Sequence, residues 1–186
     1  MILVVDMNGK RDSLGYYEFV LPIVSMAENL DACEVKHYLD VSSKDLSRCD
    51  RVILSGTALE DNITLNQPGK FQWLSDTNKP ILGICAGMQT IGVVFGLKLL
   101  ECLEIGMTQI FTIKENPLFS GELKAYSLHN FSVEEGGDFE ATARSQGCIQ
   151  AMKHKRKPIY GVLFHPEVRN EEVLKCFIEL EHYAKS

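Results

Sequence analysis

Residues 81–89 read Ile81-Leu82-Gly83-Ile84-Cys85-Ala86-Gly87-Met88-Gln89, which indicates a buried strand that turns sharply into a helix. Such a turn leaves no room for side chains two positions either side of the turn residue, so Gly83 and Gly87 let the two elements close around Cys85. The thiol then lies at a helix N-terminus, where unpaired N–H groups and the helix dipole favour the thiolate. The pattern predicts a nucleophile, and the alternative is a small apolar cysteine that fills a strand end.

A second motif, far downstream, supplies the base that a nucleophilic cysteine needs. Residues 161–167 read Gly161-Val162-Leu163-Phe164-His165-Pro166-Glu167, which indicates a buried strand running out into a turn. In an extended segment residues i and i+2 point to the same side, so the Glu167 carboxylate can orient and support the His165 imidazole. A histidine satisfied in the core or on the surface is the alternative for His165 alone. Together with Cys85, the chain order Cys, His, Glu predicts a catalytic triad.

The two motifs together resemble the class I glutamine amidotransferases, whose glutaminase domain uses a Cys-His-Glu triad. The resemblance covers nearly the whole chain and is carried by Ile53-Leu54-Ser55-Gly56, Gly83-Ile84-Cys85-Ala86-Gly87-Met88-Gln89 and Phe164-His165-Pro166-Glu167-Val168. It implies hydrolysis of L-glutamine to glutamate and ammonia through a Cys85 thioester, without a cofactor. Within the family, residues 148–155 and 157–162 are most similar to the separately encoded glutaminase subunit of archaeal GMP synthase.

Attack on a side-chain amide builds negative charge on oxygen, and two backbone N–H groups should face that charge. We expect one of them to be Ala86 N–H and the other to come from Thr57, in the loop after the strand expected at 51–54. The resemblance adds Gly56, in the same loop, as a substrate-binding residue. The family usually has a second glycine and then proline where Thr57 and Ala58 stand. Because a residue with a Cβ reaches unusual dihedrals less easily, we expect this loop to be misaligned until something reshapes it, which would lower the rate of the unassisted chain.

Further substrate-binding residues follow from the resemblance. Gln89 matches a glutamine that the family uses for substrate, and its amide offers a donor and an acceptor; an exposed helix glutamine is the alternative. Residues 127–131 lie where the family has a loop whose backbone holds the α-amino and α-carboxylate groups of glutamine. This makes His129, Asn130 and Phe131 candidates, with a plain turn histidine as the alternative for His129.

Two more departures from the family concern the acceptor of the ammonia. Leu163 stands where the family commonly has glutamine, and Arg169-Asn170 stands where the GMP synthase branch typically has a His-Thr pair. Both leave the triad intact and allow an amidotransferase that serves another acceptor. Two further functions remain open: a stand-alone γ-glutamyl hydrolase, and a catalytically silent module that regulates a synthetase by docking.

Composition is typical of a compact cytoplasmic enzyme subunit. The 186 residues are enough for a single domain over 1–186, and the net charge of −6 argues against a nucleic-acid binder. The apolar start, residues 1–5, is too short for a signal peptide or a membrane span. No G-x-x-x-x-G-K-[ST] run is present, so the acceptor chemistry should lie on a separate ATP-dependent synthetase subunit.

The cysteine positions indicate neither a metal site nor a disulfide framework. The six cysteines, at positions 33, 49, 85, 102, 148 and 176, include no C-x-x-C pair and show no ligand-like cluster with the five histidines.

Alternating short apolar runs and helical patterns predict an α/β fold, which with the resemblance becomes a three-layer, flavodoxin-like domain. We expect a mixed, mostly parallel central sheet with the nucleophile elbow, plus a smaller antiparallel section. The first half should contain strands at 2–5, 33–37, 51–54 and 81–84 and helices at 14–29, kinked at Pro22, and 87–95. The second half should contain short strands at 109–114, 124–127, 139–143, 149–152 and 159–164 and a helix at 171–183. The basic run 153–157 predicts a hairpin turn, with a docking patch as the alternative.

Overall fold

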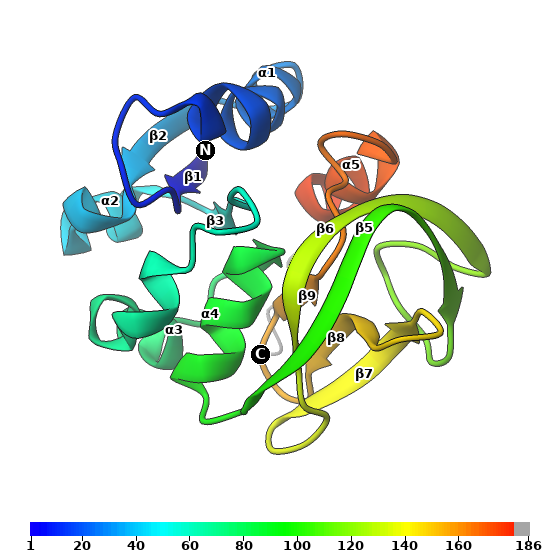
Figure 1. The fold of residues 1–186 in the computed structure, drawn as a ribbon. Coiled ribbons are helices and arrows are strands. Elements are labelled where there is room, and N and C mark those ends of the chain that lie inside the picture. The colour runs from blue at the N-terminus through cyan, green and yellow to red at the C-terminus, as the bar shows by residue number, and fades with distance from the viewer. Residues whose placement is uncertain (181–186) are drawn as a thin grey trace.

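The computed structural model describes residues 1–180, whose strands form one nine-stranded mixed sheet (Figure 1). The strand order is β2-β1-β3-β4-β9-β8-β7-β5-β6. The parallel half contains β2 (Cys33–His37), β1 (Ile2–Asp6), β3 (Arg51–Leu54), β4 (Ile81–Ile84) and β9 (Ile159–Val162). The antiparallel half continues from β9 through β8 (Ile149–His154), β7 (Phe139–Arg144), β5 (Leu99–Thr112) and β6 (Glu122–Val133). The order of the parallel half is that of flavodoxin-like sheets, which confirms the predicted fold class.

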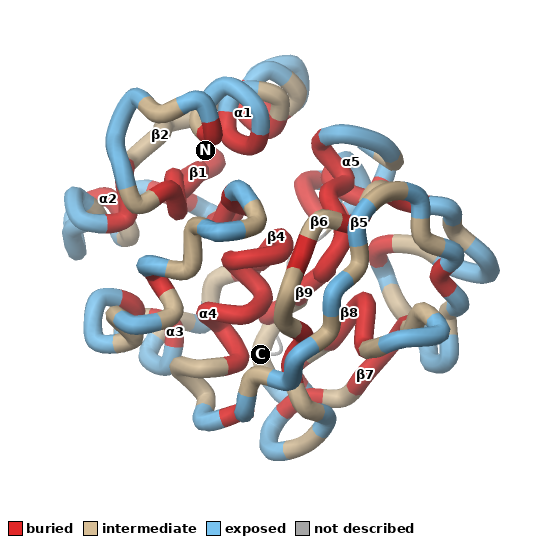
Figure 2. Tube along the Cα trace, in the orientation of Figure 1, coloured by how far each residue is buried: buried red, intermediate tan, exposed pale blue. Residues whose placement is uncertain are grey.

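Helices cover both faces of the parallel half and complete the three layers. One face packs against α1 (Leu21–Glu28) and α5 (Glu171–Glu179), and the other against α2 (Ser43–Arg48), α3 (Trp73–Asp76) and α4 (Ala86–Val94). Short 3₁₀ segments connect these elements at Tyr38–Asp40, Ile63–Asn66 and Pro68–Phe71. The strands β1, β3, β4 and β9 are largely buried, as expected for strands covered on both faces, whereas β2 at the edge of the sheet is only partly buried (Figure 2). Within residues 1–180, no helix has the length and apolar character needed to cross a membrane.

The first helical segment runs without a break over residues 14–28, which agrees with the helix expected over 14–29, but it contains a π-helical turn that was not expected. A π-helical turn spans Tyr16–Val20, and α1 begins only at Leu21. Pro22 therefore lies at the junction between the π-helical turn and α1. The π-helical turn brings the buried Phe19 ring against His165, with 4.9 Å between ring centroids.

The antiparallel half is the part that the sequence pattern predicted least completely. β5 has 14 residues and β6 has 12, and they pair from Leu99↔Val133 to Phe111↔Glu122, whereas only 109–114 and 124–127 were expected. The reason is the inverted alternation of β5, because its more buried positions include Cys102, Glu104 and Gly106 while its exposed positions carry apolar side chains. The alternation over 103–108 is that of a strand, but it assigns the exposed face of β5 to the core.

The longer β6 changes the setting of several residues. Residues 127–131 lie inside this strand rather than in a loop, and His129 is buried, so the expected loop and the turn-histidine alternative are both wrong. The basic run 153–157 forms the turn between β8 and β9, as predicted. The last helix ends at Glu179; residues 181–183 of the expected helix lie outside the described residues, and the single domain over 1–186 stays a prediction.

Candidate active site

Cys85 lies at the carboxyl end of β4 in a backbone conformation that side chains rarely adopt. Its φ is +46° and its ψ is −104°, and it directly precedes the first residue of α4. A Cβ on Gly83 would lie 2.6 Å from backbone atoms of Gly87, and one on Gly87 would lie 2.6 Å from the Leu54 carbonyl oxygen. Contacts this short confirm that both glycines are needed for the strand and the helix to close around the cysteine. The elbow is fixed to β9 by a 2.8 Å hydrogen bond from Cys85 N to the Val162 carbonyl.

His165 and Glu167 lie just beyond β9, next to β4 in the sheet. The His165 Nδ1 and Glu167 Oε1 atoms are 2.7 Å apart, and neither side chain is exposed to solvent. The main chain of His165 donates a 2.8 Å hydrogen bond to the Tyr126 carbonyl of β6. The carboxyl ends of neighbouring strands thus bring together the cysteine, the histidine and the glutamate that the sequence singled out.

The electrostatics of this pair favour a charged imidazole. Burial lowers the pKa of His165, but the negative charges of Glu167 and Cys85 outweigh burial and hold that pKa well above its ordinary value. Among the described residues, His165 Nε2 has no hydrogen-bond partner, so this nitrogen is available to accept the proton of the thiol. The arrangement can hold a thiolate–imidazolium pair supported by a buried carboxylate.

The loop after β3 places Gly56 against both members of this pair. A Cβ at Gly56 would lie 2.5 Å from His165 Cε1, 2.9 Å from His165 Nδ1 and 3.6 Å from Cys85 Cβ. Glycine at position 56 is therefore a steric requirement for the position of the imidazole, beyond the substrate contact that the resemblance implies.

Gly56→Ala should lower kcat/KM for glutamine hydrolysis about 100-fold, because displacement of a catalytic group by about 1 Å has an effect of that size. Gly69→Ala is the matched control, since a Cβ at Gly69 meets no atom within 4 Å. Steady-state kinetics and circular dichroism of both variants test the expectation. Full activity of a folded Gly56→Ala variant would contradict the close packing of Gly56 on His165.

The two expected oxyanion donors come from the start of α4 and from the loop after β3. Ala86 is the first residue of α4, where the N–H has no intrahelical acceptor. Thr57 is buried, and its hydroxyl donates a 2.9 Å hydrogen bond to the Asp61 carbonyl, which fastens the loop in place. The φ angle of Thr57 is not positive, so its backbone does not adopt the left-handed conformation that favours glycine.

A small pocket opens beside the thiol. Its lining contains the expected residues Thr57, Cys85, Gln89, His129 and Asn130, together with Ala58, Leu59, Asn62 and Leu128, which the sequence did not single out. The pocket has a volume of about 10 Å³, enough for roughly one water molecule and far too little for an amino acid. A wider groove of about 570 Å³ adjoins it and shares Leu59 and Asn130.

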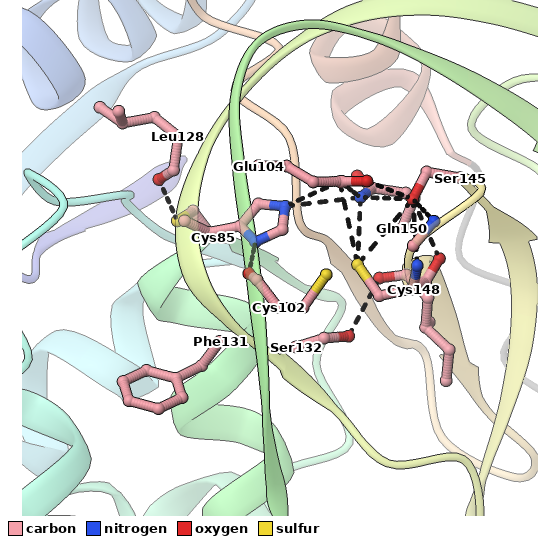
Figure 3. Close-up of polar contacts among 12 residues, drawn as sticks. Cys85, Cys102, Glu104, Leu128, Phe131, Ser132, Ser145, Cys148 and Gln150 are labelled. Atoms are coloured by element: carbon pink, nitrogen blue, oxygen red, sulfur yellow. Dashed lines mark hydrogen bonds and ion pairs between the residues drawn. The ribbon is translucent and has the colours of Figure 1, made fainter.

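Carbonyl groups of β6 hold two of the pocket residues. The Cys85 thiol lies 3.5 Å from the Leu128 carbonyl oxygen, as Figure 3 shows, and Gln89 Nε2 donates a 2.7 Å hydrogen bond to the Phe131 carbonyl. Gln89 is buried, so the alternative of an exposed helix glutamine is wrong. Phe131 itself lines the wider groove. β6 thus forms the wall of the pocket opposite the elbow.

The ring of His129 also belongs to a second group of side chains. Its Nδ1 lies 3.0 Å from the Cys102 carbonyl oxygen, and its Nε2 lies 3.2 Å from Glu104 Oε2. Cys148 completes a cluster whose four potential ligand atoms all lie within 4.8 Å of one another. The expectation that cysteines and histidines form no ligand-like cluster is therefore wrong. The sequence signal for this cluster was the pair Cys102 and Glu104, two residues apart on one strand.

Comparison with known proteins places the chain in a family. Residues 17–180 match the family described as Glutamine amidotransferase class-I. The glutamine-hydrolyzing subunit of GMP synthase from Thermococcus kodakarensis is 39% identical, over 97% of this chain and 98% of that protein. That of Methanocaldococcus jannaschii is 42% identical over 115 residues, which are 56% of this chain and only 61% of that relative.

Solved structures agree with the sequence comparison. The crystal structure of a putative GMP synthase subunit from Thermoplasma acidophilum superposes with a TM-score of 0.80 at 27% identity, covering 96% of this chain and 92% of that one. A glutamine amidotransferase from Thermotoga maritima shares the fold with a TM-score of 0.69 at 18% identity, covering 96% and 81%. From the family match over most of its length, the chain belongs to the class-I glutamine amidotransferases.

Proposed function

We propose that this chain hydrolyses L-glutamine to glutamate and ammonia and delivers the ammonia to a separate ATP-dependent synthetase subunit in the cytoplasm. The observation that carries the proposal is the buried His165–Glu167 pair, 2.7 Å apart, next to a cysteine held on a strained elbow. A buried imidazole oriented by a carboxylate beside a thiol is the arrangement that nucleophilic catalysis requires.

In the proposed reaction, the Cys85 sulfur attacks the side-chain amide carbon of glutamine, and His165 accepts the thiol proton. The tetrahedral intermediate carries its negative charge on the former amide oxygen, toward the N–H groups of Ala86 and Thr57. His165 then gives its proton to the departing nitrogen, so that ammonia leaves and a thioester remains. A water molecule, deprotonated by His165, attacks the thioester and releases glutamate with the thiol restored. Glu167 orients the imidazole throughout.

The substrate-binding roles follow the lining of the pocket. Gln89, Asn130 and the backbone of His129 hold the substrate from the lining of the pocket in this proposal. Phe131 contributes from the adjoining groove, and Gly56 from the loop beside Cys85. The present size of the pocket supports a gated site, since glutamine enters only after the Thr57 loop and β6 move apart. We therefore expect slow hydrolysis by the chain alone and faster hydrolysis when a partner is bound.

The outer face of β5 supports a partner at this position. Leu103, Ile105 and Met107 alternate along the strand and are 66%, 61% and 43% exposed. Leu103 and Ile105 also line the wider groove that adjoins the pocket. An exposed apolar row of this kind is typical of a protein interface, and its place next to the thiol suits a partner that receives ammonia.

The partner is best assigned as the synthetase subunit of GMP synthase, which converts XMP to GMP. Support comes from the relatives, several of which are named as glutamine-hydrolyzing subunits of GMP synthase, one of them alignable over almost the whole chain. The Arg169-Asn170 pair departs from that branch, so the acceptor is the part of the proposal that most needs an experiment.

The test is mass spectrometry after treatment with an electrophilic glutamine analogue, with and without excess glutamine. A single adduct on Cys85 that glutamine suppresses supports the proposed nucleophile and substrate. Adding the GMP synthase synthetase subunit with ATP and XMP should raise glutamine hydrolysis about 5- to 150-fold, the usual range of coupling between sites. Labelling that never reaches Cys85, even with that subunit present, would favour the silent docking module.

The double variant Leu103→Asp, Ile105→Asp should bind the synthetase subunit more weakly by a factor of at least about 10, because charges replace two exposed apolar contacts. Leu39→Asp is the matched control, since Leu39 is 45% exposed just after β2, at the opposite edge of the sheet. Binding isotherms of the three proteins decide the matter. Equal affinities for all three would remove β5 from the interface.

A further inference from the structure

A cluster of side chains with potential metal-ligand atoms lies around β5 and β6, in the antiparallel half of the sheet. Cys102 and Glu104 come from β5, and Cys148 comes from the turn before β8 (Figure 3). His129 comes from β6. Pairing of β5 with β6 sets Glu104 directly opposite His129. The β-bulge between Glu101 and Glu104 lies at this point of β5. Bulges commonly redirect side chains next to functional sites.

The four residues are of the types that bind zinc and related transition metals. Two thiols, an imidazole and a carboxylate match the sulfur, nitrogen and oxygen ligands of tetrahedral zinc sites. Ligand atoms of such a site lie about 3.3 to 3.8 Å apart, given the usual bond lengths. His129 Nε2 and Glu104 Oε2 are 3.2 Å apart, and Cys148 Sγ is 3.9 Å from Glu104 Oε2. Because all four atoms lie within 4.8 Å of one another, small side-chain movements would complete the tetrahedron.

The orientation of His129 is the one that metal-binding histidines adopt. A hydrogen bond from Nδ1 to the Cys102 carbonyl, 3.0 Å long, leaves Nε2 with a lone pair directed at the cluster. That lone pair faces a carboxylate oxygen of Glu104, which is another acceptor. Among the described residues, no lysine or arginine forms an ion pair with Glu104. A cation between these atoms would convert two facing acceptors into two ligands.

Gln150 shows how many acceptors converge on one point. Its Nε2 lies 2.5 Å from Glu104 Oε2, 3.4 Å from His129 Nε2, 3.4 Å from Ser145 Oγ and 3.5 Å from Cys148 Sγ. An amide nitrogen has two hydrogens, so it cannot satisfy four such neighbours. Its own Oε1 is buried and has no hydrogen-bond partner in the described part of the chain.

We propose that Cys102, Glu104, His129 and Cys148 form a site for a divalent transition-metal ion, with Zn²⁺ as the preferred occupant. Binding releases the two thiol protons to solvent and ties β5, β6 and the turn before β8 together. The role of the ion is structural. It holds His129, and the next residue, Leu128, has its carbonyl group in contact with the sulfur of Cys85. A loaded site would fix the segment of β6 that borders the glutamine pocket.

The experiment uses the full chain with Cys85→Ala, which removes the catalytic thiol as a competing ligand. The protein is stripped with a chelator under reducing conditions and titrated with Zn²⁺ or Co²⁺. We expect one equivalent of tightly held metal by elemental analysis after gel filtration. With Co²⁺ we expect a thiolate-to-metal charge-transfer band and the visible bands of tetrahedral cobalt. The absence of stoichiometric metal would overturn the proposal and leave a His129–Glu104 ion pair as the role of the cluster.

Ligand variants in the same background locate the site. Cys102→Ser and Cys148→Ser should each weaken Co²⁺ affinity by more than about 100-fold, the upper end of the loss seen for residues that only orient ligands. Cys176→Ser is the control, since Cys176 is exposed on α5. Unchanged affinity in the first two variants, or an equal loss in the control, would exclude the proposed ligands.

A second measurement does not depend on Cys102→Ser and Cys148→Ser, so it applies even if those variants do not fold. Alkylation of the Cys85→Ala protein, read at each cysteine by mass spectrometry, should slow at Cys102 and Cys148 when Zn²⁺ is present. The rates at Cys33, Cys49 and Cys176 should stay the same. Equal rates with and without Zn²⁺ at Cys102 and Cys148, or a disulfide between them in place of bound metal, would overturn the proposal.

Discussion

Cys85→Ala should lower glutamine hydrolysis about a million-fold, to the rate left by binding alone. The expectation rests on the elbow, which presents the thiol beside His165 and at the N-terminus of α4. Alanine removes the atom that forms the thioester and leaves the elbow glycines in place. The reaction is followed by glutamate release, both for the chain alone and with the synthetase subunit, so that a gated site is not mistaken for an inactive one.

The matched control is Cys176→Ala, which removes an exposed thiol from α5. It should hydrolyse glutamine at the unmodified rate. Partner binding provides the second control, because Cys85→Ala and the unmodified chain should bind the synthetase subunit with equal affinity. Hydrolysis that persists in Cys85→Ala would assign the chemistry to another residue. Loss of partner binding in this variant would instead indicate a damaged fold.

Glu167→Gln should lower kcat/KM about 10⁴-fold, which is less than the loss expected for Cys85→Ala. The glutamate orients His165 through a 2.7 Å hydrogen bond but forms no bond to the substrate. The glutamine side chain has nearly the same shape, so the packing around it should survive. Steady-state kinetics of Glu167→Gln, His165→Ala and Cys85→Ala test this division of roles, and equal losses in all three would contradict it.

The pH dependence of the Glu167→Gln variant gives an independent measurement. The negative charge of Glu167 raises the pKa of His165, so its removal should lower that pKa. The imidazolium must give its proton to the departing ammonia, and activity is therefore lost as pH rises through the pKa of His165. The alkaline limb of kcat/KM should move to lower pH in the variant. An alkaline limb at the same pH in both proteins would mean that Glu167 does not act on His165 electrostatically.

The sequence predicted the parts of the site that depend on local backbone geometry. The elbow follows from Gly83 and Gly87, and the proximity of His165 and Glu167 follows from their spacing. Each depends on a few neighbouring residues, so one sequence is enough to recognise it. Most of the parallel half of the sheet was also predictable, because strands such as β1 and β4 are buried on both faces and appear as continuous apolar runs.

The antiparallel half was less predictable because its side chains follow a different rule. β5 has apolar residues on its exposed face and Cys102, Glu104 and Gly106 at its more buried positions, so the alternation of hydrophobicity indicates a strand but assigns the wrong face to the core. The approach of Cys148 to Glu104 depends on how the sheet brings β8 toward β6, which a strand pattern does not contain. The small size of the pocket could not be predicted either, because it depends on contacts between Gln89 and β6.

The elbow also affects how stable the folded chain can be. A backbone conformation such as that of Cys85 costs about 1 to 3 kcal/mol, and it persists only where the surroundings impose it. A typical domain is stable by only about 5 to 15 kcal/mol, so one residue takes up a substantial part of that margin. The buried parallel strands on either side of the elbow have to offset this cost. A core substitution in β3, β4 or β9 should therefore disturb the backbone conformation of Cys85 before it unfolds the whole domain. The reason is that relaxing the strained turn releases free energy locally, while the rest of the fold stays intact.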